Sequence, residues 1–265
     1  MIKQSQYTNR LGVKIILIAA FSLIVSWIGC SHCFAESNKV VMVLFDLSGS
    51  TANDRTRRAY LKDFRTILDI VDVRENILGS FIKPGDVLMA DIISDNSVGQ
   101  SSFPIQKEFP RFSTWQDNRL YFGKKVRFEK EGVLQVAEKI LLKEDRKIMN
   151  TDIFSALHVS ERVFKTFHDR KAILIIMSDM LEQSREYDFT MDPLSENRII
   201  EIIRKQKGRG LPDLKGVTVY VTGARSSDRN RFMSIQRFWL RYLTECGATI
   251  EAKNYGNGLI GLKAN

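Results

Sequence analysis

The sequence predicts an α/β protein with a doubly wound, mostly parallel sheet flanked by helices and one antiparallel edge strand. Apolar runs rich in β-branched residues recur along the chain, and stretches with apolar residues at helical spacing separate them. The clearest runs, 40–45 and 173–177, are apolar throughout, as expected of strands buried on both faces. No internal repeat or low-complexity segment interrupts this order.

The first half of the chain contributes two strands and two helices to this prediction. A helix follows residues 53–54, which offer capping side chains, and runs to about residue 77 with its apolar residues on one face. Lys83-Pro84-Gly85-Asp86 forms a turn, and 87–93 is the second parallel strand. A helix covers 132–143.

The second half alternates in the same way. We expect, in order, a helix opening at Thr151-Asp152, a strand over 171–177, a helix over 195–205, a loop over 208–216, a strand over 216–223, a helix over 232–246 and an edge strand over 248–252. Cys246 falls on the apolar side of the last helix, which favours a small core residue over a reactive thiol.

The 265 residues suffice for one sizeable domain, and a composition of 44% hydrophobic and 27% charged residues excludes a disordered chain. We place this domain at 38–255, after a leader at 1–35. An insertion around 95–130 interrupts it, because Ser, Gly and Asn there give way to aromatic residues interleaved with charges. Packing of these aromatics onto the domain is favoured over a nucleic-acid or partner surface.

The leader has the pattern of an export signal. Lys3, Arg10 and Lys14 are basic, no acidic residue precedes Glu36, and 15–29 is almost wholly apolar. Three fates are compatible with it: cleavage after Ala35, lipid attachment at Cys30 in a lipobox-like sequence, or retention as an anchor. All three predict an exported domain in the periplasm or cell envelope, and cleavage after Ala35 leaves Cys246 without a disulfide partner.

The first buried run ends in a sequence suited to binding a metal ion. Asp46, Ser48 and Ser50 offer hard oxygen donors at alternate positions, and Gly49 permits a tight turn. Mg²⁺ and Mn²⁺ prefer such donors. The carboxyl ends of parallel strands are also where ligands bind in α/β sheets. The sequence therefore predicts a Mg²⁺ or Mn²⁺ loop at the end of the first strand.

This Asp-x-Ser-x-Ser sequence resembles the first motif of von Willebrand factor A (vWA) domains, which carry a metal-ion-dependent adhesion site. In that family a Thr on a second loop and an Asp after a later strand complete the site. Asn150-Thr151-Asp152 resembles the Thr loop, although a Gly often precedes the Thr, and Ser178-Asp179 resembles the third motif. The interval from Ser50 to Thr151 is long for the family, which implies inserted material.

The resemblance implies a vWA/Rossmann-like fold with an antiparallel edge strand near 103–109. It also implies a metal site made of Asp46, Ser48, Ser50, Thr151 and Asp179. The hydroxyls would bind the cation directly or through water, and the two carboxylates would supply negative charge. Three neutral hydroxyls leave the cation under-neutralised, so that it gains by accepting a carboxylate from a partner protein. Asp152 and Glu182 are weaker candidates for the site, and Asp152 serves equally well as a helix-start residue.

We therefore expect a non-catalytic, metal-dependent protein-binding module that takes part in an envelope complex and meets a membrane only through its leader. A Mg²⁺-dependent phosphohydrolase is the first alternative, but Ser48 stands where a second carboxylate would favour it. A basic nucleic-acid-binding module is the second. The nucleic-acid alternative rests on the aromatic segment and on the positive formal charge. This charge is +9 for the whole chain and +6 without the three leader cations.

Three arginines, Arg55, Arg57 and Arg58, follow the predicted metal loop in the first turn of the next helix. Cations at a helix N-terminus oppose the helix dipole, so their position is locally unfavourable. Two interpretations remain open: three solvated side chains, or a basic rim that attracts an acidic ligand to the metal loop.

Overall fold

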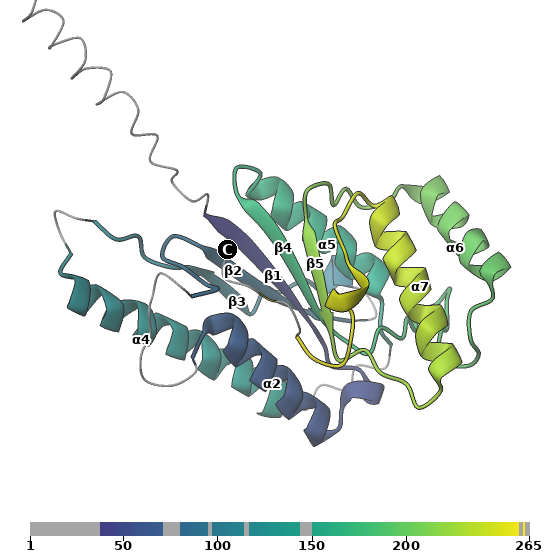
Figure 1. Ribbon diagram of the computed structural model, residues 1–265, viewed down its shortest axis with the longest axis horizontal. Coiled ribbons are helices and arrows are strands. Elements are labelled where there is room, and N and C mark those ends of the chain that lie inside the picture. Colours follow the sequence, from purple (N-terminus) through teal and green to yellow (C-terminus); the bar gives the residue numbers. More distant parts are fainter. Residues whose placement is uncertain are drawn as a thin grey trace, which may run out of the picture. The chain divides into compact units, whose positions relative to one another are not determined.

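The computed structural model describes residues 38–70, 80–94, 97–113, 117–143, 150–259 and 262. Its sheet has five strands in the order β3-β2-β1-β4-β5 (Figure 1). They are β1 (Lys39–Asp46), β2 (Val87–Ile93), β3 (Ile105–Glu108), β4 (Lys171–Met177) and β5 (Thr218–Thr222). Only the β2–β3 pair is antiparallel, so the predicted mostly parallel sheet with one antiparallel edge strand is confirmed.

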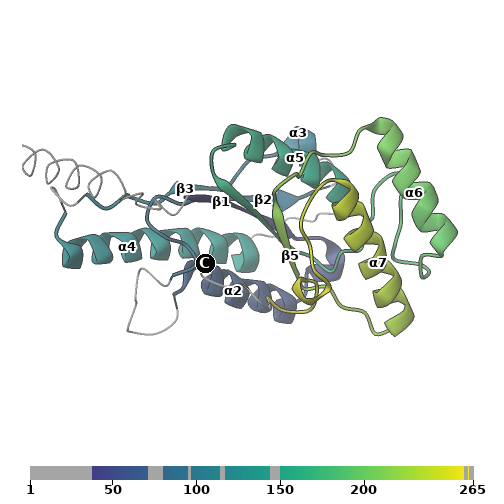
Figure 2. The ribbon, with the colours of Figure 1, turned by 45° about the horizontal axis from the view of Figure 1, so that its top comes forward.

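Helices cover both faces of the sheet (Figures 1 and 2). The helices are α2 (Asp54–Leu68), α3 (Ser97–Gln100), α4 (Arg119–Glu138), α5 (Ile153–Thr166), α6 (Glu196–Arg209) and α7 (Arg229–Glu245). A wider helical turn, η3 (Lys139–Lys143), continues α4. Helices α2 and α4 lie on one face, and α5, α6 and α7 lie on the other.

Strand β1 forms the centre of both cores because its side chains alternate between the two faces. Val41, Val43 and Phe45 pack with α2 and α4, and Phe45 meets Phe64 of α2 with ring centroids 5.5 Å apart. Val40, Met42 and Leu44 pack with α5 and α7. Every residue of β1 is buried, which places Asp46 at the end of a fully enclosed strand.

Three predicted boundaries are wrong. Helix α2 ends at Leu68, where Asp69 adopts a left-handed φ of 56° and terminates it; the predicted end, near residue 77, lies outside the described residues. Helix α4 begins at Arg119, inside the segment that we interpreted as an insertion. The last predicted strand is reduced to isolated bridges at Thr249 and Tyr255, because a 3-10 turn at Ala252–Asn254 bends the chain away.

The aromatic residues of the predicted insertion divide between core and surface. Phe109 and Phe122 are buried, as the packing interpretation requires, whereas Tyr121 and Phe128 are exposed. Helix α6 continues to Arg209 and so shortens the predicted loop. Cys246 is buried, as expected of a small core residue.

Residues Asn38–Asn265 form a compact unit that is separate from Met1–Ser37. Two hydrophobic clusters, one on each face of the sheet, give this unit a core of its own, so it has the means to fold without the preceding segment. The leader predicted at 1–35 lies outside the described residues. Within the described part of the chain, no helix is both long and apolar enough to cross a membrane.

Candidate metal centre

The loop after β1 is held in a tight turn by its own hydrogen bonds. Thr51 is the last residue of a short 3-10 turn, Gly49–Thr51. Its hydroxyl donates to the carbonyl oxygens of Asp46, at 2.8 Å, and of Ser48, at 3.0 Å. The sequence motifs did not single out Thr51, although a threonine hydroxyl can donate to the carbonyl oxygen of a residue a few positions earlier in the chain. The turn fixes the direction in which the two serines point.

Both predicted serine donors come together in this loop. The Oγ atoms of Ser48 and Ser50 lie 3.1 Å apart. Ser48 is buried and Ser50 is exposed, so the pair lies at the boundary between core and solvent. The backbone N–H of Ser48 donates to Oδ1 of Asp46 at 2.9 Å, which ties the carboxylate to the same turn.

The third predicted motif meets the first at the end of β4. The hydroxyl of Ser178 donates to Oδ2 of Asp46 at 2.6 Å, across the two neighbouring strands. Asp179, the next residue, forms a hydrogen bond with the Ser50 side chain. Asp46, Ser48, Ser50 and Asp179 are thus linked in one hydrogen-bonded cluster. Its position is the carboxyl end of two parallel strands, where α/β folds bind ligands.

Burial makes this cluster electrostatically unfavourable when both carboxylates are charged. Burial is the main cause that raises the pKa of Asp46, although its hydrogen bonds to Ser178 and Ser48 oppose the rise. Burial and the nearby charge of Asp46 raise the pKa of Asp179 to about 6. A cation between the two carboxylates would relieve both effects. The two close hydroxyls and two carboxylates are hard oxygen donors, so the residues present fit a divalent cation of the Mg²⁺ or Mn²⁺ type.

Thr151 is held at the same edge of the sheet by the backbone. It is buried and pairs with Gln183, through N–H···O distances of 2.8 and 2.9 Å. The next N–H, of Asp152, donates to the carbonyl oxygen of Ser94, directly after β2, at 3.3 Å. The Thr151–Asp152 segment is therefore bonded to Ser94, directly after β2, and to Gln183, in the segment that follows β4. Within the described residues, no hydrogen bond joins it to the Asp46–Ser50 loop.

The two weaker candidates support the Thr151 loop. Asp152 is the N-cap of α5, and its carboxylate accepts from the N–H of Ser155 at 2.9 Å and from the Ser155 hydroxyl at 2.6 Å. Glu182 is fully buried, and its Oε2 accepts from the N–H of Ile153 at 2.8 Å. Both acids therefore bind the start of α5, and the helix-start interpretation of Asp152 matches its contacts.

Arg57 is not part of a basic rim. Its guanidinium is buried and donates to three backbone carbonyl oxygens: Leu47 at 3.1 Å, Thr51 at 3.3 Å and Leu141 at 3.3 Å. The first two oxygens belong to the metal loop and the third to η3. Arg57 therefore clamps the loop to the helix that covers the neighbouring face of the sheet. The solvated interpretation holds only for Arg55 and Arg58, which are exposed.

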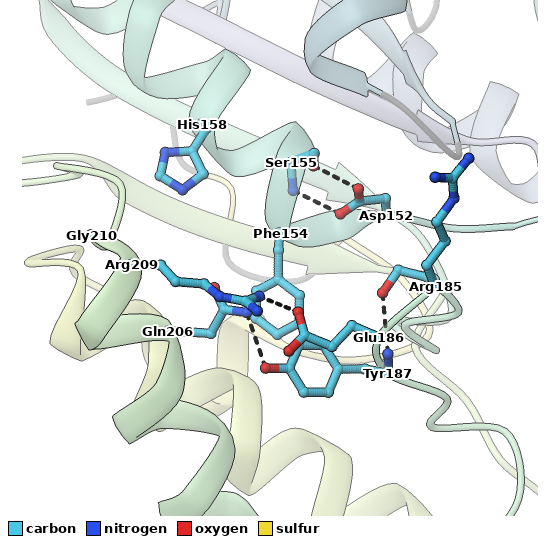
Figure 3. A pocket seen from close by; sticks show the side chains of 11 residues that line it. Asp152, Phe154, Ser155, His158, Arg185, Glu186, Tyr187, Gln206, Arg209 and Gly210 are labelled. Atoms are coloured by element: carbon cyan, nitrogen blue, oxygen red, sulfur yellow. Dashed lines mark hydrogen bonds and ion pairs between the residues drawn. The ribbon is translucent and has the colours of Figure 1, made fainter.

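A cavity of about 490 Å³ lies beside the Thr151 loop, between the start of α5, the segment 184–187 and the end of α6 (Figure 3). Figure 3 shows Asp152 and Ser155 at its upper edge and, below them, Glu186 in contact with Arg209. Glu186 forms ion pairs with Arg209 and Lys205. Because the Glu186 carboxylate is already paired with these two cations, it is not available as a metal ligand. The cavity is therefore a polar hollow next to the site.

Within the described residues, no group of three or more His, Cys, Asp or Glu side chains is arranged to hold a metal. A zinc centre of the usual nitrogen and sulfur type is therefore not formed by these residues. The cluster around Ser48 and Ser50 has a different donor set, because it combines hydroxyl oxygens with the carboxylates of Asp46 and Asp179.

No protein-family model and no curated protein matches this chain. Among solved structures, it is similar to proximal thread matrix protein 1 from the mussel byssus, with 17% identity, a TM-score of 0.44 and coverage of 85% of this chain and 44% of that one. Another structure of the mussel protein has a zinc-occupied metal-ion-dependent adhesion site (MIDAS) motif.

Two bacterial structures are also similar. A von Willebrand factor type A protein from Catenulispora acidiphila has 10% identity, a TM-score of 0.37 and coverage of 80% of this chain and 42% of that one. An aerotolerance-related membrane protein from Bacteroides fragilis has 12% identity, a TM-score of 0.36 and coverage of 85% and 93%. The chain thus spans less than half of the mussel and Catenulispora proteins.

The strand order and the position of the three motifs at one edge of the sheet agree with the predicted family resemblance. The described domain is vWA-like in its fold.

Proposed function

We propose that this protein is a non-catalytic, divalent-metal-dependent protein-binding module. One cluster supports this proposal. In it the Ser48 and Ser50 hydroxyls lie 3.1 Å apart, and Asp46 accepts a hydrogen bond from Ser178 at the end of β4. Ser48, Ser50 and Thr151 would supply hydroxyl donors to Mg²⁺ or Mn²⁺. Asp46 and Asp179 would supply the negative charge, directly or through water.

The bound cation would act as a bridge between two proteins. When Asp46 and Asp179 act through water, the direct ligands are neutral hydroxyls that donate little charge, so the cation keeps a preference for a further anionic ligand at its open position. A carboxylate from an acidic side chain of a partner protein supplies that ligand. Ser50 is the exposed member of the cluster, and this gives a partner a route to the cation.

The basic and apolar pattern before residue 36 supports export of this module to the periplasm or cell envelope. Its partner would then be another envelope protein, and a lipid at Cys30 or a retained apolar segment would hold the module at a membrane. Analysis of the N-terminus and mass of the protein purified from its own cells separates cleavage after Ala35, lipidation at Cys30 and retention.

Metal-dependent capture tests the proposed function. Residues 36–265 are immobilised, and envelope extract is applied in Mg²⁺ or in EDTA. We expect a specific protein to be retained in Mg²⁺ and released by EDTA, and to be lost with Ser50→Ala. Ser227→Ala is the matched control, because Ser227 is also exposed but lies between β5 and α7. Retention that is unchanged by EDTA and by Ser50→Ala would refute a metal bridge.

A further inference from the structure

One face of the first half of α4 is apolar and basic and is covered by no described part of the protein. Leu120, Tyr121 and Phe128 are 72%, 73% and 75% exposed, and Lys124 and Lys125 are exposed between them. We call these five residues the α4 stripe. They lie at i, i+1, i+4, i+5 and i+8, which places them on one face of the helix. The buried side chains of this part of α4 are Phe122, Val126 and Lys130, on the opposite face.

The α4 stripe lies beyond the start of β1. Lys130 donates to the Ser80 hydroxyl at 2.7 Å, and the adjoining Phe81 ring packs against Lys39, the first residue of β1, at 4.4 Å. At its other end, α4 leads into η3, whose Leu141 is bonded to Arg57 beside the metal loop. Helix α4 therefore runs in the same direction as β1. The ten residues from Lys130 back to Leu120 carry the helix roughly 15 Å past the start of the strand.

Figures 1 and 2 both show this part of α4 projecting past the sheet, at the end opposite the loop that follows β1. The eight residues of β1 separate the two ends by roughly 23 Å. The α4 stripe and the candidate metal centre can therefore be occupied at the same time.

The chemistry of the α4 stripe fits an anionic lipid surface. Leucine and phenylalanine side chains enter the acyl boundary of a bilayer, and tyrosine favours the headgroup level. Lys124 and Lys125 form no ion pair with another described residue, so both are available to lipid phosphates. A nucleic-acid surface would instead stack bases on several rings, whereas this face has two rings and an aliphatic side chain.

We propose that the α4 stripe docks this protein onto membranes that contain anionic phospholipids. The docked domain then has the start of β1 towards the lipid and the metal loop away from it, where a partner protein can reach it. The position of Asn38 agrees with this orientation, because the chain enters the domain at the start of β1. A lipid at Cys30 would lie only eight residues before Asn38, at most about 29 Å of extended chain.

Vesicle co-sedimentation of residues 36–265 tests the proposal without the leader. We expect the protein to sediment with vesicles of equal parts phosphatidylcholine and phosphatidylglycerol, and to stay in solution with phosphatidylcholine alone. Lys124→Gln with Lys125→Gln should weaken binding about 30-fold, because each lysine near an anionic surface contributes roughly a factor of five. Serine at Leu120, Tyr121 and Phe128 should abolish sedimentation. EDTA should change neither result, which separates this proposal from the metal-dependent function.

The control variant carries serine at Met191, Ile200 and Met233, three other exposed apolar residues, and should bind as the wild type does. All variants should keep the wild-type melting temperature, since the exchanged side chains are exposed. Failure to sediment with anionic vesicles, or equal binding by the α4 and control variants, would overturn the proposal. So would a concentration-dependent dimer in analytical ultracentrifugation that the serine substitutions in α4 abolish, because the stripe would then be covered by a second copy.

Discussion

Replacing Arg57 by methionine removes the three hydrogen bonds that join the metal loop to η3. Methionine retains most of the apolar stem, so the change isolates the guanidinium. Hydrogen bonds from a charged donor contribute about 1.5 to 3 kcal/mol each, but removal of the arginine also removes its own cost of burial. We therefore expect a net loss of about 3 kcal/mol in the free energy of unfolding, within the range for breaking a buried charged network.

The assay is thermal unfolding of residues 36–265. For a domain of this size, a loss of about 3 kcal/mol lowers the melting temperature by roughly 6 to 12 °C. Arg58→Met is the matched control: Arg58 lies one residue further along α2 and forms only an exposed ion pair with Asp54, at 2.9 Å. Such a pair contributes about 0.3 to 0.5 kcal/mol, so the control should change little. Equal melting temperatures for the two variants would show that Arg57 does not clamp the loop.

Three further predictions concern the same end of the sheet. Thr51→Val removes the hydroxyl that donates to the carbonyl oxygens of Asp46 and Ser48. It should lower the free energy of unfolding, measured by chemical denaturation, by about 1 to 2 kcal/mol, whereas Thr51→Ser should lower it less. Equal losses in the two variants would refute a role for the hydroxyl. Burial raises the pKa of Glu182 well above 4.5, so the folded state keeps a proton that the unfolded state releases. The contribution of Glu182 to the free energy of unfolding therefore falls as pH rises above about 4.5. Glu182→Gln should remove this contribution and leave the shallower dependence that the raised pKa values of Asp46 and Asp179 produce; curves of melting temperature against pH with equal slopes in the two proteins would contradict it. Gly223→Ala would place a Cβ 2.5 Å from the Tyr60 ring at a φ of 92° and should cost at least about 2 kcal/mol, with a smaller loss in a Tyr60→Leu background.

The sheet could be predicted because β1 and β4 contain continuous apolar runs and β2 is apolar except for Asp91. Helix α4 was only half predicted. Lys130 occupies a buried position on its inner face, where the sequence pattern requires an apolar side chain, and Gly132 resembles a helix boundary. The bond from Lys130 to Ser80 makes this burial acceptable, and that bond joins residues fifty positions apart. A pattern confined to neighbouring residues contains no sign of it.

The candidate metal centre shows the same limit. Asp46, Ser48 and Ser50 lie within five residues, so their proximity could be predicted from the chain itself. Arg57 is local in sequence as well, yet its burial depends on Leu141, which belongs to a distant helix. In the sequence Ser178 stands out only as part of the Ser178-Asp179 motif. Its hydrogen bond to Asp46 becomes evident only once β1 and β4 are neighbours in the sheet.

Metal binding at the Ser48–Ser50 pair is the central claim, and a thermal titration tests it most directly. Residues 36–265 are unfolded in EDTA and in rising Mg²⁺ or Mn²⁺, alongside Ser50→Ala and Ser227→Ala. A cation that binds only the native state adds about 2.7 kcal/mol at a hundred times its dissociation constant, or roughly 5 to 11 °C. We expect this rise for the wild type and for Ser227→Ala, and a much smaller rise for Ser50→Ala. The same rise in all three proteins, or none in the wild type at saturating metal, would contradict it.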